Sequence, residues 1–101
     1  MYMIRAVYNC KRGKASDIVA AFKTLNQALM SNKGFANGRI YVDMTGRMDT
    51  VIYQFEAESL DQFYKLERGL FVNIDAATQR LIDALNEQAV AGYREIYEVI
   101  L

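Results

Sequence analysis

The stretch from Lys14 to Ser31 constrains the fold most strongly, because its apolar residues recur with the period of an α-helix. They fall at positions i, i+4, i+7 and i+11 and share one stripe of the helix surface: Ile18, Phe22, Leu25 and Leu29. Polar residues occupy much of the remaining surface, and Gly34 after the stretch is typical of a helix end. The pattern predicts an amphipathic helix from about Lys14 to Ser31.

Alternating runs on both sides of this helix predict strands. Residues 2–9 are rich in Tyr, Ile and Val and end at a polar segment. Gly38 opens a second run that extends to Met44, and a third run covers residues 51–57. The turn-like segment 45–49 contains glycine and joins the second and third runs. We expect these two runs to pair as an antiparallel hairpin.

The C-terminal half contains a second helical region and a last strand. Ser59 is a candidate N-cap with Gln62 three residues later, which is the arrangement of a capping box. We expect Gly69 to interrupt the helix that follows, a further helix to cover residues 75–89, and a strand to cover residues 93–101.

The predicted order is strand, helix, strand, strand, helix in two pieces, strand, within one domain that spans residues 1–101. With right-handed crossovers, this βαββαβ order gives the split βαβ arrangement of ferredoxin-like α+β folds. We expect a four-stranded antiparallel sheet with its helices on one face. Numbered along the chain, the strands should lie in the order 4-1-3-2.

The sheet face without helices must meet either water or a partner. A hydrated face carries polar residues at nearly every second strand position. In the first, third and last predicted strands, both sets of alternating residues instead include apolar or aromatic side chains. We therefore expect a homodimer in which two such faces pack together as a dimeric α/β barrel. The alternative is a monomer with one partly hydrated face.

The hairpin segment Ile40–Val51, which reads IYVDMTGRMDTV, and the capped helix start at Ser59-Leu60 resemble the dimeric α/β-barrel superfamily, especially its NIPSNAP-like small proteins. The segment 12–14 before the first helix is also similar. The resemblance implies a homodimer with a pocket between sheet and helices or within the barrel. The superfamily includes antibiotic-biosynthesis monooxygenases and haem-degrading enzymes. This chain has no histidine and no tryptophan, so their histidine-ligated haem and tryptophan-bearing patterns do not match, and no catalytic residue carries over.

Composition excludes several function classes. Without histidine, Ser-His-Asp and Cys-His nucleophiles are impossible. Equal numbers of basic and acidic residues, 12 each, argue against a nucleic-acid partner. The chain shows no secretory pattern and no apolar run near the ~20 residues that span a bilayer, so we expect a cytoplasmic protein without membrane contact. We expect no metal and no cofactor, haem included, because only Tyr or Cys could ligate it.

Two functional hypotheses remain. The first is a small barrel protein whose pocket, if it has one, binds a small apolar or aromatic ligand. The second is a cofactor-independent monooxygenase or isomerase of the antibiotic-biosynthesis type, acting on a polycyclic or phenolic substrate. In that enzyme Arg5 or Arg94 would stabilise a developing oxyanion, and Tyr41 or Tyr97 would orient the ring. A connected cavity of a few hundred Å³ that reaches an arginine and a tyrosine would favour the enzyme.

Each candidate residue also has a simpler interpretation. The two arginines would form structural ion pairs if they lay opposite Glu56 or Glu98, and strand tyrosines are common at interfaces. The lone Cys10 is expected to be an unreactive thiol despite its basic neighbours. Acidic residues that flank a hairpin turn, here Asp43 and Asp49, commonly accept local backbone hydrogen bonds.

Overall fold

Strands and helices follow one another along the chain in the predicted order. The computed structural model describes residues 1–46, 48–72 and 76–100, and of residues 70–72 it describes the backbone alone. The elements are β1 (Tyr2–Cys10), α1 (Ala15–Met30), β2 (Phe35–Val42), β3 (Thr50–Ala57), α2 (Leu60–Val72), α3 (Ala76–Gln88) and β4 (Ala89–Glu98).

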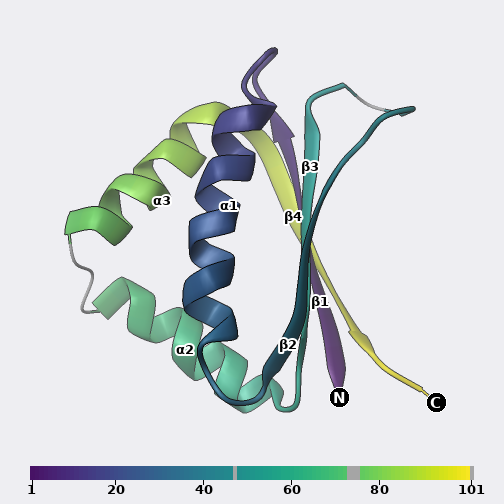
Figure 1. Ribbon diagram of the computed structural model, residues 1–101, viewed down its shortest axis with the longest axis vertical. Helices are drawn as coiled ribbons and strands as arrows, with labels where there is room; N and C mark the ends of the chain where they lie inside the picture. The colour runs from purple at the N-terminus through teal and green to yellow at the C-terminus, as the bar shows by residue number, and fades with distance from the viewer. Residues whose placement is uncertain (47, 73–75, 101) are drawn as a thin grey trace.

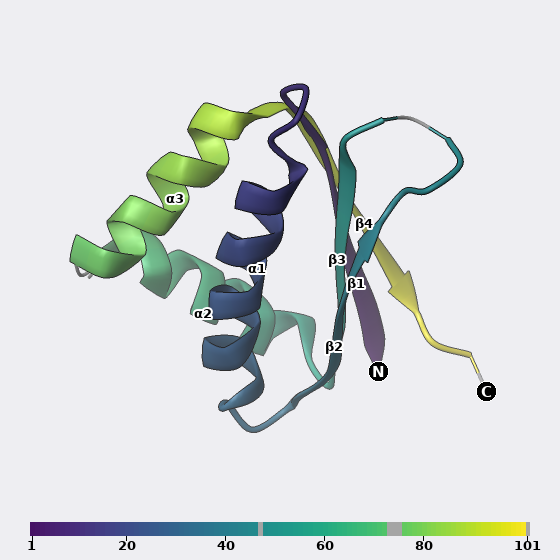
Figure 2. The same ribbon diagram turned by 45° about the horizontal axis from the view of Figure 1, so that its top comes forward.

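The strands form one antiparallel sheet in the order β2-β3-β1-β4, which confirms the predicted topology. Figure 1 shows α1, α2 and α3 together on one side of this sheet. Turning the molecule, as in Figure 2, leaves the other side of the sheet without any covering element. The fold is therefore a ferredoxin-like α+β fold with one bare sheet face.

The core lies between α1 and the central strands. Ile4 of β1 and Val51 of β3 are 1% and 0% exposed, and Ile18 and Phe22 of α1 are buried against them. A chain of aromatic rings extends this core toward α2, with neighbouring centroids 5.2 to 6.2 Å apart: Phe22, Tyr53, Phe55, Phe63 and Phe35. The predicted stripe of α1 thus faces the sheet.

Strand β2 begins at Phe35, earlier than the predicted start at Gly38. The first residues of this strand were not predicted, because a bulge interrupts its pairing with β3. The register shifts between Ala36 and Arg39, and Asn37 takes a positive φ of 55°. The Asn37 Nδ2 donates to Glu56 Oε2 at 2.8 Å, which holds the bulge against β3. An extra residue of this kind hides the alternation on which a strand prediction depends.

The helical region after β3 differs from the prediction at Gly69, which does not interrupt α2. A Cβ at Gly69 would meet nothing within 4 Å, so this position is open and the helix tolerates glycine there at a cost of roughly 1 kcal/mol. The Gln62 N–H donates to Ser59 Oγ, which confirms the predicted cap. Among the described residues the Ser59 N–H does not donate to the Gln62 side chain, so the capping box is not complete, and the Gln62 side-chain amide donates to the Lys33 carbonyl.

Strand β4 starts at Ala89, directly after α3 and before the predicted start at Tyr93, and ends at Glu98. Three residues of the predicted elements lie outside the described residues: Arg47 of the turn, Asp75 at the helix start and Leu101 at the strand end. None of the helices in the described part of the chain is both long enough and apolar enough to cross a bilayer.

Candidate functional site

A largely apolar cavity of about 230 Å³ lies between the sheet and the helices α1 and α2. Its lining comes from β1, α1, β3, α2 and β4: Ile4, Ala6, Leu25, Ala28, Leu29, Asn32, Tyr53, Phe55, Phe63, Leu66, Glu67 and Arg94. An apolar concavity with few polar groups is the usual form of a small-molecule site.

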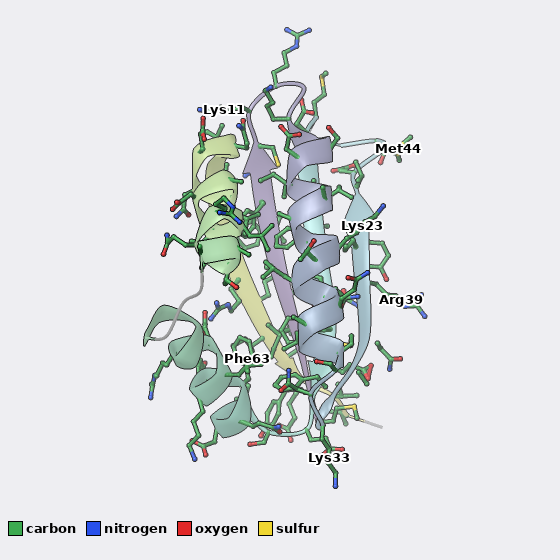
Figure 3. The ribbon with its side chains drawn as sticks, turned by 60° about the vertical axis from the view of Figure 1, so that its left-hand side comes forward. Lys11, Lys23, Lys33, Arg39, Met44 and Phe63 are labelled. Atoms are coloured by element: carbon green, nitrogen blue, oxygen red, sulfur yellow. The ribbon has the colours of Figure 1, made fainter. Side chains whose placement is uncertain are left out.

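Small side chains create this cavity. Ala6 on β1 and Ala28 on α1 leave space where larger residues would close the gap between sheet and helix. Leu25 and Leu29 of the α1 stripe are only partly buried, because the cavity lies beside them. In Figure 3, Phe63 lies where α2 approaches the sheet. Leu25 and Leu29, the C-terminal half of the α1 stripe, therefore line the cavity and also pack against the core.

An ion pair supplies the charged groups of the cavity. Arg94, on the helix-facing side of β4, donates from Nη1 to Glu67 Oε2 at 3.2 Å and from Nη2 to Glu67 Oε1. Its guanidinium also lies 5.2 Å from the ring centroid of Phe63, a cation–π contact. Arg94 is thus in a structural ion pair, but its partner comes from α2 and is neither Glu56 nor Glu98.

Two tyrosines near the cavity are kept protonated. Burial raises the pKa of Tyr53, whose hydroxyl donates to Asn26 Oδ1 of α1 at 2.8 Å. Burial is also the main reason that the pKa of Tyr8 is raised, with Arg94 lowering it and Glu67 raising it. The charges of Arg94 and Glu67 therefore act on the Tyr8 hydroxyl. At neutral pH both residues act as hydroxyl groups and not as phenolates.

The structure separates the four candidate residues. Arg94 lines the cavity on the helix side, whereas Arg5, Tyr41 and Tyr97 lie on the bare face of the sheet. There the Tyr97 hydroxyl donates to Glu95 of the same strand, and this hydrogen bond raises the pKa of Tyr97. One site containing all four residues is thus excluded within a single chain.

The bare face consists of cross-strand rows. One polar row crosses all four strands in register: Arg39 of β2, Gln54 of β3, Arg5 of β1 and Glu95 of β4. The next row is apolar and aromatic: Tyr41, Ile52, Val7 and Tyr93. An open hollow of about 470 Å³ spans these two rows on the β2 side and is lined by Arg5, Tyr41, Val42, Asp43, Met44, Ile52 and Gln54.

Glu67 was not among the predicted site residues, although its position in the sequence carries a signal. Phe63 is on the predicted apolar side of its helix, and Glu67 follows it at i+4, on the same face. An acidic residue in that position must find a partner near the sheet. Tyr53 is one of the strand tyrosines considered above, but its hydrogen bond with Asn26 was not predicted, because this contact joins a strand to a helix and leaves no pattern in the sequence.

The remaining candidates have structural roles. Cys10 is buried, and burial, followed by the charge of Asp49, raises the pKa of its thiol. Asp43 accepts hydrogen bonds from the backbone of Thr45 and Gly46, as predicted, whereas Asp49 accepts one from Gly13 in a different loop. Across residues 1–46, 48–72 and 76–100, no three Asp, Glu or Cys side chains form a group that could hold a metal ion.

No protein-family model and no curated protein sequence matches the chain. Solved structures do. An uncharacterized NIPSNAP domain protein from Burkholderia xenovorans superposes with a TM-score of 0.76 at 10% identity, covering 99% of this chain and 95% of that one. A NIPSNAP family protein from Agrobacterium tumefaciens strain C58 gives 0.74 at 17% identity, covering 96% and 90%. An antibiotic biosynthesis monooxygenase gives 0.73 at 12% identity, covering 100% of both chains. As the resemblance in its sequence implies, this chain has the ferredoxin-like fold of NIPSNAP proteins and antibiotic biosynthesis monooxygenases.

Proposed function

We propose that residues 1–101 form one domain of a cytoplasmic homodimeric α/β barrel that binds a small aromatic molecule between its helices and its sheet. The cavity beside Arg94 and Glu67 is the observation that carries this proposal. Its wall is apolar, and its charged pair offers a donor and an acceptor to the same ligand.

The size of the cavity limits the ligand. A volume of about 230 Å³ is below the ~300–1,000 Å³ of sites for drug-sized molecules, but above the ~150 Å³ of an apolar cavity that binds benzene. One or two fused rings fit this range better than a larger polycycle. A phenolic hydroxyl suits the ion pair, because it can donate to Glu67 and accept from Arg94.

The bare sheet face supports the homodimer. Its aromatic residues Tyr93 and Tyr97 are 56% and 49% exposed, which is unusual for a face that stays in water. The same face carries both signs of charge, with Arg5 and Arg39 against Glu56 and Glu95. A two-fold contact brings one patch against its own copy, so the patch must be self-complementary in charge.

Titration with 2-naphthol tests the cavity. The chain has no tryptophan, so naphthol emission can be followed without a tryptophan background. Ala28→Phe fills the cavity from α1, and Ala20→Phe is the matched control, because Ala20 is also exposed on α1 and is not part of the lining of this cavity. We expect the control to bind like the wild type and Ala28→Phe to bind at least about tenfold more weakly. Equal binding by both variants would contradict the proposal.

A cofactor-independent monooxygenase or isomerase is the second candidate, and one observation favours it. The cavity reaches both an arginine and a tyrosine, Arg94 and Tyr53. In this enzyme Arg94 would stabilise an oxyanion that develops on a bound phenol. Oxygen uptake with a dihydroxynaphthalene would establish the oxygenase if Arg94→Met abolishes the uptake even at substrate concentrations that saturate its weakened site. If the wild type shows neither oxygen uptake nor substrate rearrangement, the enzyme is excluded and ligand binding remains as the proposed function.

A further inference from the structure

Arg5 has an unusual environment for a charged residue. It lies on the central strand β1, and its Nε is shielded from solvent without a hydrogen-bond partner. No ion pair joins Arg5 to any residue of the described ranges. Arginine remains charged at all physiological pH values, so a shielded and unpaired N–H of this group favours an added acceptor.

The acidic residues of the bare face are already engaged. Glu95 is the cross-strand neighbour of Arg5, but its carboxylate accepts the Tyr97 hydroxyl. Glu56 accepts the Asn37 side-chain amide in the β2 bulge. In a symmetric dimer the second copy presents the same face, with the same acids in the same contacts. A second copy therefore meets Arg5 with carboxylates that already accept a hydrogen bond within their own chain.

The hollow beside Arg5 has space for an acceptor that comes from elsewhere. Its volume is about 470 Å³, with Tyr41 and Ile52 as apolar walls and the Gln54 amide next to Arg5. The carboxylate of Asp43 also lines it, at the hairpin end, where Oδ1 accepts the backbone N–H groups of Thr45 and Gly46. The opening of this hollow lies on the bare face of the sheet.

We propose that Arg5 is the centre of a second binding site, which takes a small planar carboxylate and which the second copy closes in the homodimer. The guanidinium of Arg5 carries a planar fork of N–H donors that matches the two oxygens of a carboxylate. The apolar body of the ligand then lies against Tyr41 and Ile52. The closure by a second copy rests on the homodimer of the proposed function, whereas the anion contact rests on Arg5 alone.

Benzoate is the probe, and NMR of the arginine Nε–H groups is the readout. The Arg5 resonance is identified by its loss in Arg5→Gln. Titrations run at constant ionic strength, with benzamide as the uncharged control for benzoate. Arg39→Gln is the matched variant, because Arg39 belongs to the same polar row but does not line the hollow, and Figure 3 shows it pointing outward at the β2 edge.

We expect benzoate to shift the Arg5 Nε–H signal and benzamide to leave it in place. Binding should weaken at least about tenfold in Arg5→Gln and by less than about twofold in Arg39→Gln. Arg5→Lys keeps the charge and loses the fork, so it should also bind more weakly than the wild type. Equal losses in Arg5→Gln and Arg39→Gln, or no shift at Arg5, would overturn the site.

Two further readings on the same samples separate this inference from the proposed function. Ala28→Phe should leave benzoate binding unchanged, because the cavity and the hollow lie on opposite faces of the sheet. Loss of benzoate binding in that variant would assign the anion to the cavity and overturn the second site. A monomeric sedimentation mass together with a benzoate shift at Arg5 would refute the closure by a second copy.

Discussion

The hydrogen bond between Tyr53 and Asn26 predicts a defined loss of stability in Tyr53→Phe. Tyr53 is 5% exposed, and its hydroxyl donates to Asn26 Oδ1 at 2.8 Å. Phenylalanine removes the donor and leaves the amide oxygen without it, which costs ~1–2 kcal/mol. For a chain of this size, the midpoint of thermal unfolding should fall by roughly 4–8 °C for each kcal/mol.

The same substitution should change the alkaline limb of the stability curve. Above about pH 10 an unfolded tyrosine ionises, whereas burial raises the pKa of Tyr53 in the folded chain. The folded state then binds more protons than the unfolded state, so stability falls as the pH rises. At about pH 11 this loss is ~1.4 kcal/mol for Tyr53 and is absent in Tyr53→Phe. The deficit of the variant at neutral pH should therefore nearly vanish at pH 11.

Urea unfolding at the two pH values, at one fixed protein concentration, measures both effects. Tyr64→Phe is the control, because it removes a hydroxyl from the exposed side of α2. Gly38→Ala should disturb the acceptor of the same hydrogen bond, because the new Cβ would lie 1.8 Å from Asn26 Oδ1. Its effect should be less than additive with that of Tyr53→Phe. A constant deficit across the pH range, or full additivity, would refute the reasoning.

Three further predictions concern strain, reactivity and charge. Gly34→Ala should destabilise more than Gly13→Ala in urea unfolding, because both have positive φ but only the first would place a Cβ 2.4 Å from Gln62 Oε1; equal losses would contradict this. The raised pKa and burial of Cys10 predict slow reaction with a thiol reagent at neutral pH and rapid reaction in urea; fast labelling of the folded chain would refute it. Arg94→Met should cost at most ~1 kcal/mol, because its ion pair is partly solvated, yet weaken 2-naphthol binding; unchanged binding would separate Arg94 from the site.

The sequence predicts the arrangement of elements well because local patterns encode it. The stripe at Ile18 and Phe22, the cap at Ser59 and the alternation in β3 each depend on residues close in the chain. Together with the rule of right-handed crossovers, they predict the strand order of the sheet. The exceptions are local as well: the bulge at Asn37 hides the start of β2, and α2 continues through Gly69.

Only part of the candidate site could be predicted from the sequence, because the site depends on which side of β4 faces the helices. Alternation places Arg94 and Tyr93 on opposite faces of the sheet but does not show which of the two residues faces the helices. The register does, by pairing Ala6 with Arg94 and Val7 with Tyr93. Strand β4 also begins directly after α3 at Ala89, upstream of the predicted strand. The sequence therefore indicates Arg94 as a candidate residue, but it does not predict the ion pair of Arg94 with Glu67 or the cavity beside this pair.

Sedimentation equilibrium at micromolar concentration tests most directly whether the bare sheet face is covered by a second copy. If two sheet faces cover each other, the wild type should have twice the 11.5 kDa mass of one chain. Tyr93→Lys puts a charge in the bare face and should lower the mass to that of one chain, while Tyr64→Lys, on exposed α2, should not. A wild type that sediments as a single chain would contradict the account, and so would a Tyr93→Lys variant that remains dimeric.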